Sequence, residues 1–527
     1  MTVPATIEGR TQPPDRGQRF VRNVLWNWLG TIVSLFIGFI LSPYLIAKLG
    51  ADGYGVWAIT FALVEYYWFF DLGFRSATVK FVAHYSATGD RENVRTVIST
   101  VFLFSGVAAG VVFSMMAVLS RHIEGFFRVP ASLREDFHAL LMLITLSWCL
   151  GLVFNVFNAG IEAVQCFEYS TKAAIIAATV RAAGGFLALY LGYKLIAIGL
   201  VALASQAFGY AANYIYFRRV FPRLGLSFRA VRISTLYTMA RFGIHTFVMT
   251  VSNQVLSQSP PLLIGHFLSA AFAGFYILPV RLLQYTVELV GRIGIVTNTS
   301  AAELAARGDC DGLAELAVYT NRYCLVIFMP LAILLGTCGK PVLALWVGRP
   351  FAGQSAAVLP ILLAGCVIGV VGQYSASMLL QGLGRHQRYA RSLLMEAVAG
   401  VLLLLVAIPR WGIVGAAWVA ASLMILNRGL VASWLISRTV GISFTHYLQS
   451  VYAWPALIAL PVFGMACWLR STALPGANWI QIFALAGALG ASYYSLAFCT
   501  ALERRHRALL LSWIGSRWNQ ALGVANA

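Results

Sequence analysis

The sequence predicts an all-α, polytopic membrane protein with about 14 transmembrane helices, arranged as two six-helix lobes related by a parallel repeat, plus two extra C-terminal helices. Three observations lead to this fold class. The chain is 59% hydrophobic and only 11% charged, with a mean hydropathy of +0.77, whereas soluble domains carry about 25% charged residues. Apolar stretches of spanning length recur along the chain, and Lys and Arg gather in alternate connections between them.

The predicted helices follow from the length of each apolar stretch, because about 20 apolar residues are needed to cross ~30 Å of hydrocarbon. Stretches that meet this length lie at residues 22–47, 55–83, 96–119, 136–160, 172–193, 195–217, 236–264, 272–299, 319–339, 357–381, 389–408, 412–437, 451–470 and 479–500. The connections between them are short, so no large soluble domain is predicted on either side of the membrane.

The distribution of Lys and Arg predicts the orientation. With the N-terminus inside, the segments on the cytoplasmic side carry 21 of these residues and the outer segments carry 9. This asymmetry predicts that both termini lie in the cytoplasm. The protein is expected in the cell membrane, which is the inner or plasma membrane. The net charge of +19 is interpreted first as this bias, and a further part of it is open to a role in attracting anionic lipid or an anionic substrate. No nucleic-acid partner is predicted.

A repeat at an offset of about 216 residues predicts the two lobes. It pairs Gly30 with Gly243, Pro43 with Pro261, Gly55 with Gly274, Gln165 with Gln381 and Gly199 with Gly415. Six helices per repeat is an even number, so both lobes enter the membrane in the same direction and a site is expected between them. The predicted parts are an N-terminal cytoplasmic tail (1–20), an N-lobe (21–217), a basic cytoplasmic linker expected to form an interfacial amphipathic helix (218–235), a C-lobe (236–437), two further helices (451–500) and a C-terminal cytoplasmic tail (501–527).

Charged residues inside the predicted spans are the candidates for function, because each costs at least ~2.5–3.5 kcal/mol at a helix centre. The basic ones are Arg75, Lys80, Arg181, Arg241, Arg281, Arg292, Arg322 and Arg428, and the acidic ones are Glu65, Asp71, Glu288 and Glu396. The excess is positive, so a cavity lined by these groups attracts an anion. We expect Lys80, Arg322 and Arg428, which lie near cytoplasmic helix ends, to act as anchors at the membrane surface.

Two helices carry the deeper arginines. Asp71 and Arg75 are four residues apart, so on one helix they share a face and form a pair that orients the guanidinium; the alternative is a purely structural ion pair. In "PVRLLQYTVELVGRIG", Arg281, Glu288 and Arg292 recur at helical spacing with Gln284 or Tyr285. This stripe predicts a helix that lines an aqueous cavity, with Glu288 and Arg292 as an alternative internal pair.

Motifs of catalysis and metal binding are not found in the sequence. The eight cysteines are scattered, form no CxxC and no Cys/His cluster, and are interpreted as packing residues. There is no Gly-rich phosphate loop, Ser nucleophile elbow or DxD motif, and the outer loops are short. The sequence therefore predicts no enzyme, no metal and no cofactor.

Two stretches resemble a known family. "NWLGTIVSLFIGFILSPYLIAKLGADGYGVWAI" with "DLGFRSATVKFVAHYSATGD", and "LQGLGRHQRYARSLLMEAVAGVLLLLVAIPRWGIVGAAWVAAS", resemble bacterial polysaccharide-biosynthesis flippases of the multidrug/oligosaccharidyl-lipid/polysaccharide exporter superfamily, over about residues 20–440. The resemblance implies a two-lobe transporter that moves undecaprenyl-pyrophosphate-linked oligosaccharide from the inner to the outer leaflet by alternating access. It also implies work beside a polysaccharide polymerase and glycosyltransferases.

The resemblance implies a cationic cavity on the first, second, seventh and eighth helices. Arg75, Arg241, Arg281 and Arg292 fall on helices of that set, and Arg181 on the fifth helix matches it less closely. These arginines are the expected pyrophosphate ligands, while Asp71, Glu65 and Glu288 are candidates for coupling to an ion or for orienting an arginine.

Two other functions stay open at this level. A multidrug cation antiporter of the same superfamily is expected to need unpaired carboxylates, which the basic excess disfavours. An integral-membrane glycosyltransferase or ligase is expected to need catalytic groups in a sizeable outer loop. The sequence gives neither the glycan, whether O-antigen, exopolysaccharide or capsule, nor the coupling ion.

Overall fold

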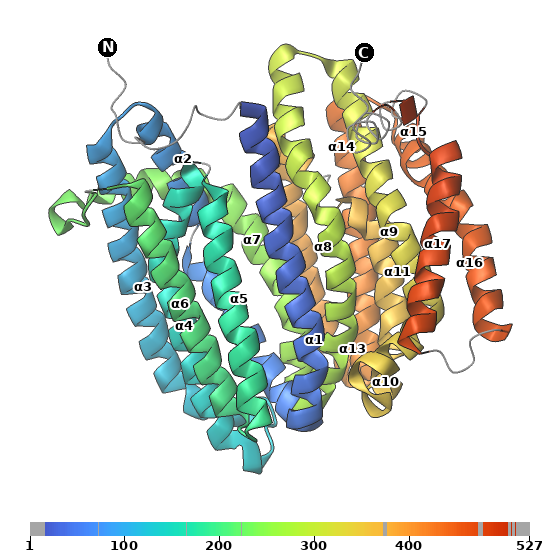
Figure 1. Ribbon diagram of the computed structural model, residues 1–527, viewed down its shortest axis with the longest axis horizontal. Coiled ribbons are helices and arrows are strands. Elements are labelled where there is room, and N and C mark those ends of the chain that lie inside the picture. Colours follow the sequence, from blue (N-terminus) through green and yellow to red (C-terminus); the bar gives the residue numbers. More distant parts are fainter. Residues whose placement is uncertain are drawn as a thin grey trace, which may run out of the picture. The chain divides into compact units, whose positions relative to one another are not determined.

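The structure is a computed structural model that describes residues 16–71, 73–164, 166–222, 224–372, 377–472, 478–503, 507–508 and 512. Every regular element in this part of the chain is a helix, which confirms the predicted all-α membrane fold (Figure 1). The chain forms two compact units, residues 1–247 and 248–527, and the division falls within one helix. Each unit is described separately.

The first unit holds seven α-helices and three 3₁₀ segments among its described residues. They are α1 (Arg16–Glu65), η1 (Tyr66–Asp71), α2 (Phe74–Ala87), α3 (Arg91–Phe126), η2 (Ala131–Leu133), α4 (Arg134–Ala163), α5 (Phe167–Tyr190), α6 (Leu195–Val220), η3 (Phe228–Ala230) and the start of α7 (Ile233–Phe267). In space, α4 packs against α3 and α6, and α5 packs against α6 and α1 (Figure 1). The short helix α2 packs against α3 and α4, so it is held inside this unit.

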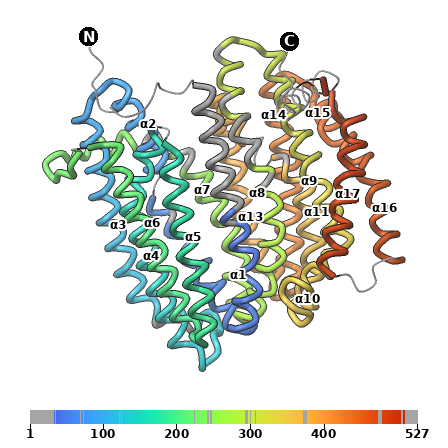
Figure 2. The backbone as a smooth tube through the Cα atoms, in the orientation of Figure 1, coloured from blue at the N-terminus to red at the C-terminus, as the bar shows by residue number. Residues whose placement is uncertain are grey.

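The second unit is built around α9. Its elements after α7 are α8 (Ala270–Arg307), α9 (Cys310–Val347), α10 (Arg349–Ser355), α11 (Val358–Val371), α12 (Ser377–Gly382), α13 (Gln387–Leu423), the π-helix η5 (Met424–Val431), α14 (Ala432–Val440), α15 (Phe444–Leu448), the π-helix η6 (Gln449–Ala453), α16 (Trp454–Thr472) and α17 (Trp479–Thr500). Helix α9 contacts α8, α11, α16 and α17, and Figure 2 traces the chain through them.

Local signals set the helix ends. Asp90 and Asp309 precede α3 and α9, and their side chains accept hydrogen bonds from the backbone N–H of Asn93 and Gly312, respectively. Such N-caps satisfy donors that the first helical turn leaves free. Asn478 and Gln481 form a complete capping box at the start of α17.

The number of spanning helices differs from the prediction. Within the described residues, ten helical stretches are long and apolar enough to cross a membrane, or eleven if the bent pair α10 and α11 counts as one span. The predicted number of 14 is therefore not confirmed. Two stretches, Leu35–Asp71 and Gln387–Val440, each run over two predicted segments. The physical reason is that single glycines at positive φ, Gly50 (70°) and Gly412 (61°), bend the chain where loops were expected.

Two other predicted elements are corrected. The expected continuous helix over 55–83 is broken, because α1 ends at Glu65, a 3₁₀ segment follows, and Gly73 adopts a left-handed conformation (φ 77°) before α2. The expected amphipathic helix over 218–235 is also wrong. After α6, the described residues of this segment hold only the short η3, and α7 begins at Ile233. The segment is tied to α3 by the Ser227 and Arg232 backbone N–H groups, which donate to the hydroxyls of Ser99 and Thr100.

Candidate functional site

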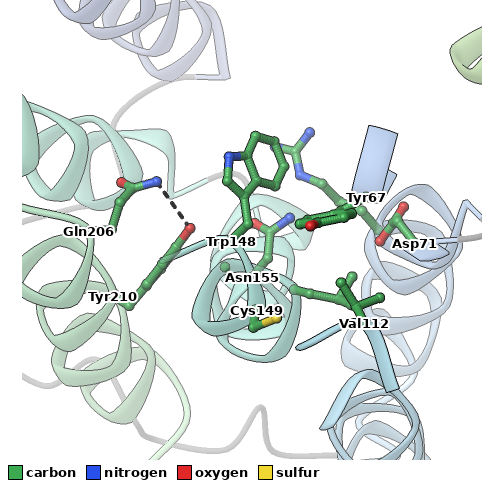
Figure 3. A pocket seen from close by; sticks show the side chains of 11 residues that line it. Tyr67, Asp71, Val112, Trp148, Cys149, Asn155, Gln206 and Tyr210 are labelled. Atoms are coloured by element: carbon green, nitrogen blue, oxygen red, sulfur yellow. Dashed lines mark hydrogen bonds between the residues drawn. The ribbon is translucent and has the colours of Figure 1, made fainter. Parts of the chain in front are cut away.

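A pocket of about 330 Å³, lined mainly by apolar surface with several polar side chains, lies within the first unit. We call it the unit 1 pocket. Its walls come from η1, α2, α3, α4 and α6, and its lining residues are Tyr67, Asp71, Arg75, Val112, Trp148, Cys149, Gly151, Leu152, Asn155, Gln206 and Tyr210. In Figure 3, Gln206 and Tyr210 lie on one side, Tyr67 and Asp71 on the other, and Trp148 and Asn155 between them. Charged, amide and hydroxyl side chains from otherwise apolar helices therefore meet at this pocket.

Helix α2 is fixed by an apolar cluster next to the pocket. Phe74, its first residue, is 2% exposed and packs edge-on against Phe104 of α3, with the ring centroids 4.8 Å apart. The same cluster includes Val82 of α2 and Phe157 of α4. Because Phe74 is buried in this cluster, the following residue, Arg75, starts from a defined position on the helix.

Arg75 is held by a carboxylate of another helix. Its Nη2 donates to both oxygens of Glu162 in α4, at 2.7 and 2.9 Å. Glu162 in turn accepts a hydrogen bond of 3.0 Å from the side-chain amide of Asn158, one helical turn earlier. The Arg75 side chain stays 44% exposed whereas that of Glu162 is 17% exposed. The guanidinium therefore has a fixed position and keeps an accessible side.

The prediction that Asp71 and Arg75 lie on one continuous helix is wrong. Asp71 is the last residue of η1 and Arg75 lies in α2, so the two do not share a helix. The Asp71 carboxylate lies within hydrogen-bonding range of the backbone N–H groups of Gly73 and Arg75. The ion pair of the Arg75 guanidinium is with Glu162 of α4.

The remaining walls are aromatic rings and amides in defined positions. The hydroxyl of Tyr67, whose residue is 7% exposed, lies 3.2 Å from the hydroxyl of Thr145. The Gln206 side-chain amide donates a long hydrogen bond of 3.4 Å to the Tyr210 hydroxyl (Figure 3). A methyl group at Gly151 would lie 2.4 Å from that hydroxyl, so glycine at this position lets Tyr210 approach α4.

Comparison with known proteins places the chain. Residues 20–297, which are 278 of 527 and so more than half of the chain, match the family model described as "Polysaccharide biosynthesis protein". The chain belongs to the polysaccharide biosynthesis protein family.

Two curated relatives cover most of the chain. An "Uncharacterized membrane protein EpsK" of Bacillus subtilis (strain 168) is 21% identical over 523 residues, which are 96% of this chain and 100% of that protein. A "Putative O-antigen transporter" of Shigella flexneri is 22% identical over 429 residues, which are 79% of this chain and 98% of that protein.

Solved structures share the fold. The inward closed form of the lipid II flippase MurJ has a TM-score of 0.71 at 12% identity, over 91% of this chain and 99% of MurJ. An inward-facing multidrug resistance MATE transporter of the MOP superfamily has a TM-score of 0.67 at 12% identity, over 78% of this chain and 99% of the transporter. The two solved structures therefore share the fold of this chain, which agrees with the fold that the sequence resemblance implied.

The other predicted site residues of this family member are distributed over several helices. Arg281 is partly exposed on α8, Arg181 is exposed on α5, and Glu65 is the last residue of α1. Glu288 lies on α8 with Arg281, so that part of the stripe shares one helix as predicted. The side chains of Arg241 and Arg292 lie outside the described part of the structure. Roles for these residues stay predictions.

Two arginines that were expected to act as surface anchors make contacts with protein groups. Arg428 is 8% exposed and its Nε lies 3.4 Å from the Glu396 carboxylate, while its Nη2 donates to the side-chain oxygen of Asn253 at 3.2 Å. Arg322 is partly buried, and its Nε donates to the backbone carbonyl of Ser450 at 2.6 Å. Both arginines therefore bind groups inside the second unit.

Sequence reasoning missed the partner of Arg75 and several pocket residues. Glu162 falls two residues beyond the predicted span 136–160 and so was not counted among the intramembrane acids. A search for charged residues in apolar spans does not find Trp148, Asn155 or Gln206, because these side chains are uncharged. The usable signal was the i, i+4 spacing of Asn158 and Glu162 at the end of α4, which is where the structure places Arg75.

Proposed function

We propose that this protein is a flippase that moves undecaprenyl-diphosphate-linked oligosaccharide from the inner to the outer leaflet of the membrane by alternating access. The observation that carries the proposal is Arg75, a partly exposed guanidinium fixed by Glu162 at the unit 1 pocket, in a chain of the polysaccharide biosynthesis protein family. The names of its relatives, a putative O-antigen transporter and a lipid II flippase, point to lipid-linked saccharides as the cargo class.

The arginines answer the main physical difficulty of this transport. A diphosphate loses its hydration when it leaves water, so its charge needs strong donors along the path. Guanidinium groups offer paired N–H donors that match phosphate oxygens. We assign this role to Arg75 and Arg281, and as further ligands to Arg241, Arg292 and Arg181. For Arg75, Nη2 is engaged by Glu162, so its remaining donors on the exposed side face the substrate.

The cycle needs a difference between states. The polyprenyl tail stays in lipid while the headgroup crosses, and residues 21–217 and 236–437 move as two bodies. A ligand drives such a change only if it binds one state better than the other. Glu65, Asp71 and Glu288 are the candidates for coupling this cycle to an ion gradient. Glycosyltransferases supply the lipid-linked oligosaccharide, and a polymerase uses it after translocation.

Surface-glycan export tests the proposal. The chain and its variants are expressed in a host lacking its own flippase for that glycan, and exported glycan is measured per folded protein, with folding checked by size-exclusion chromatography. Arg75→Ala and Arg281→Ala are expected to abolish export while the protein stays folded. Arg307→Ala, which removes an arginine paired with Glu303 at the surface, is the matched control and is expected to export normally. Full export by both Arg75→Ala and Arg281→Ala contradicts the proposal.

A further inference from the structure

We propose that the unit 1 pocket binds a sugar ring of the lipid-linked glycan, next to the diphosphate rather than around it. This inference rests on the proposed function and names a subsite for one part of the substrate. The pocket lies away from the helix ends, because Trp148 is near the middle of α4 (Arg134–Ala163) and Tyr210 is near the middle of α6 (Leu195–Val220). Polar groups at that depth are costly and are usually kept for a ligand.

The charge of the pocket argues against a diphosphate inside it. The charged groups at the pocket are the Arg75 guanidinium and the Asp71 carboxyl group in its lining, together with the Glu162 carboxylate that pairs with Arg75. The arginine and Glu162 cancel, so the sum is zero if Asp71 is protonated and −1 if it is ionised. Neither state gives the pocket a net positive charge, so the pocket suits an uncharged ligand that carries hydroxyl groups, while the N–H donors on the exposed side of Arg75 stay available to a diphosphate outside the pocket.

The wall chemistry fits a sugar. Aromatic rings of Tyr67, Trp148 and Tyr210 offer flat apolar faces for the C–H side of a pyranose. The Asn155 side-chain amide has no hydrogen bond to any group in the described part of the chain, and Gln206 has only its long bond to Tyr210. These amides, with the Asp71 carboxylate, supply both donors and acceptors for hydroxyl groups. A polyprenyl or acyl chain uses none of them.

The size of the pocket limits what enters. Small-molecule sites occupy roughly 300–1,000 Å³, and 330 Å³ is at the small end. It suits one or two sugar rings and leaves the rest of an oligosaccharide outside. The first sugar is bonded to the diphosphate, so a diphosphate on the exposed side of Arg75 leaves that sugar within reach of the pocket.

Binding to two matched lipids tests the subsite. The full chain is placed in nanodiscs and titrated calorimetrically with a C10 polyprenyl diphosphate, and with the same lipid carrying one glucose, galactose, N-acetylglucosamine or N-acetylgalactosamine. The measured quantity is the ratio of the two Kd values, bare lipid over glycosylated lipid. We expect at least one sugar to tighten binding roughly tenfold, as for burying a ring with one or two hydrogen bonds.

Three variants probe the pocket without touching its charges. Asn155→Leu keeps the volume and removes the amide, Trp148→Leu removes the largest ring, and Gly151→Ala pushes on the Tyr210 hydroxyl. Each is expected to bring the ratio close to one while the Kd of the bare lipid stays as in the wild type. Gly110→Ala is the matched glycine control, because nothing lies within 4 Å of the added methyl group, and it is expected to keep the ratio.

The outcomes separate the two proposals. Arg281→Ala is expected to weaken both lipids by the same factor, because it acts on the diphosphate. If the bare lipid binds in an Arg281-dependent way but no sugar in the set tightens binding, or if all three pocket variants keep the wild-type ratio, the sugar subsite is wrong and the flippase proposal stands. If neither class of lipid binds the wild-type protein, the proposed function itself fails.

Discussion

Arg75 of α2 and Glu162 of α4, which lie 87 residues apart in the sequence, form an ion pair with Nη2 2.7 Å from Oε1. Placing a charge in a membrane-spanning unit is costly, and a partner of opposite charge reduces that cost. The pair therefore has two interpretations. It is either a structural link between two helices, or a device that positions the guanidinium for a substrate.

Reversing the pair distinguishes these interpretations. The double variant Arg75→Glu/Glu162→Arg keeps an ion pair between α2 and α4 but moves the positive charge to the other helix. We expect near-wild-type yield of folded protein and loss of glycan export, because the guanidinium no longer faces the substrate. The single variant Arg75→Glu places two carboxylates, its own and that of Glu162, next to each other, and it is expected to lose both folded yield and export. Restored export in the double variant means that the pair is only structural.

A second pair lies deep in the second unit and supports a stability prediction. Glu396 of α13 accepts a 2.6 Å hydrogen bond from the Asn427 amide, and its carboxylate lies beside Arg428 of the π-helix η5. The Glu396 side chain is 2% exposed. Glu396→Ala leaves Arg428 buried without its counter-charge, a change that typically costs about 3–5 kcal/mol. We expect a large fall in the thermal midpoint of the purified protein and a lower folded yield.

The control for Glu396 is a surface pair. Glu303 binds Arg307 four residues later, and their side chains are 63% and 70% exposed. Exposed pairs contribute only about 0–1 kcal/mol, so Glu303→Ala is expected to leave the thermal midpoint almost unchanged. Equal midpoints for Glu396→Ala and Glu303→Ala show that the buried pair adds no stability.

These residues also show how far the sequence alone reaches. Low charge and the length of the apolar stretches predict an all-α membrane protein correctly, because both depend on composition averaged over some 20 residues or more. The same averaging hides a one-residue bend such as Gly50. It also fails for Arg428, since distance from a helix end says nothing about which neighbours the side chain faces. Arg75 was found as a candidate because its charge is unusual in the span, while its partner Glu162 depends on the packing of α2 against α4.

Close packing at Gly372 leads to a third prediction. A methyl group at this position, the C-cap of α11, would lie 1.8 Å from the backbone carbonyl oxygen of Arg428. The contact is with backbone, so no side-chain rotation relieves it. The Gly372 carbonyl also accepts a 3.0 Å hydrogen bond from the hydroxyl of buried Tyr389. Gly372→Ala is therefore expected to destabilise by at least the ~1–3 kcal/mol typical of overpacking, which thermal unfolding monitored with a thiol-reactive dye measures.

The comparison variant for Gly372 is Gly464→Ala. Gly464 is on α16, also within the second unit, and nothing lies within 4 Å of the added methyl group. Because alanine favours helix over glycine, this variant is expected to match or slightly exceed the wild-type midpoint. A midpoint for Gly372→Ala as high as that of Gly464→Ala would falsify the close approach of α11 and η5.

Arg322 supports a prediction about the last two helices. From α9, its Nε donates to the carbonyl of Ser450 in η6 at 2.6 Å, and its Nη1 donates to the carbonyl of Ala501, just after α17, at 3.4 Å. One side chain thus ties α9 to both ends of the segment that includes α16 and α17. Arg322→Ala removes these bonds and is expected to raise amide hydrogen exchange in residues 449–453 and near 501, with little change in α8 or α11.

The matched arginine is Arg438, which is exposed and stacks over the Trp434 ring at 5.8 Å within its own helix α14. A contact between neighbours on one helix surface restrains no second element, so Arg438→Ala is expected to leave exchange at 449–453 as in the wild type. The contrast matters because the sequence placed Arg322 near a cytoplasmic helix end, where a long basic side chain reaches the lipid headgroups. If Arg322→Ala and Arg438→Ala give the same exchange pattern, Arg322 acts as such a surface anchor, and the attachment of α16 and α17 depends on their apolar contacts with α9.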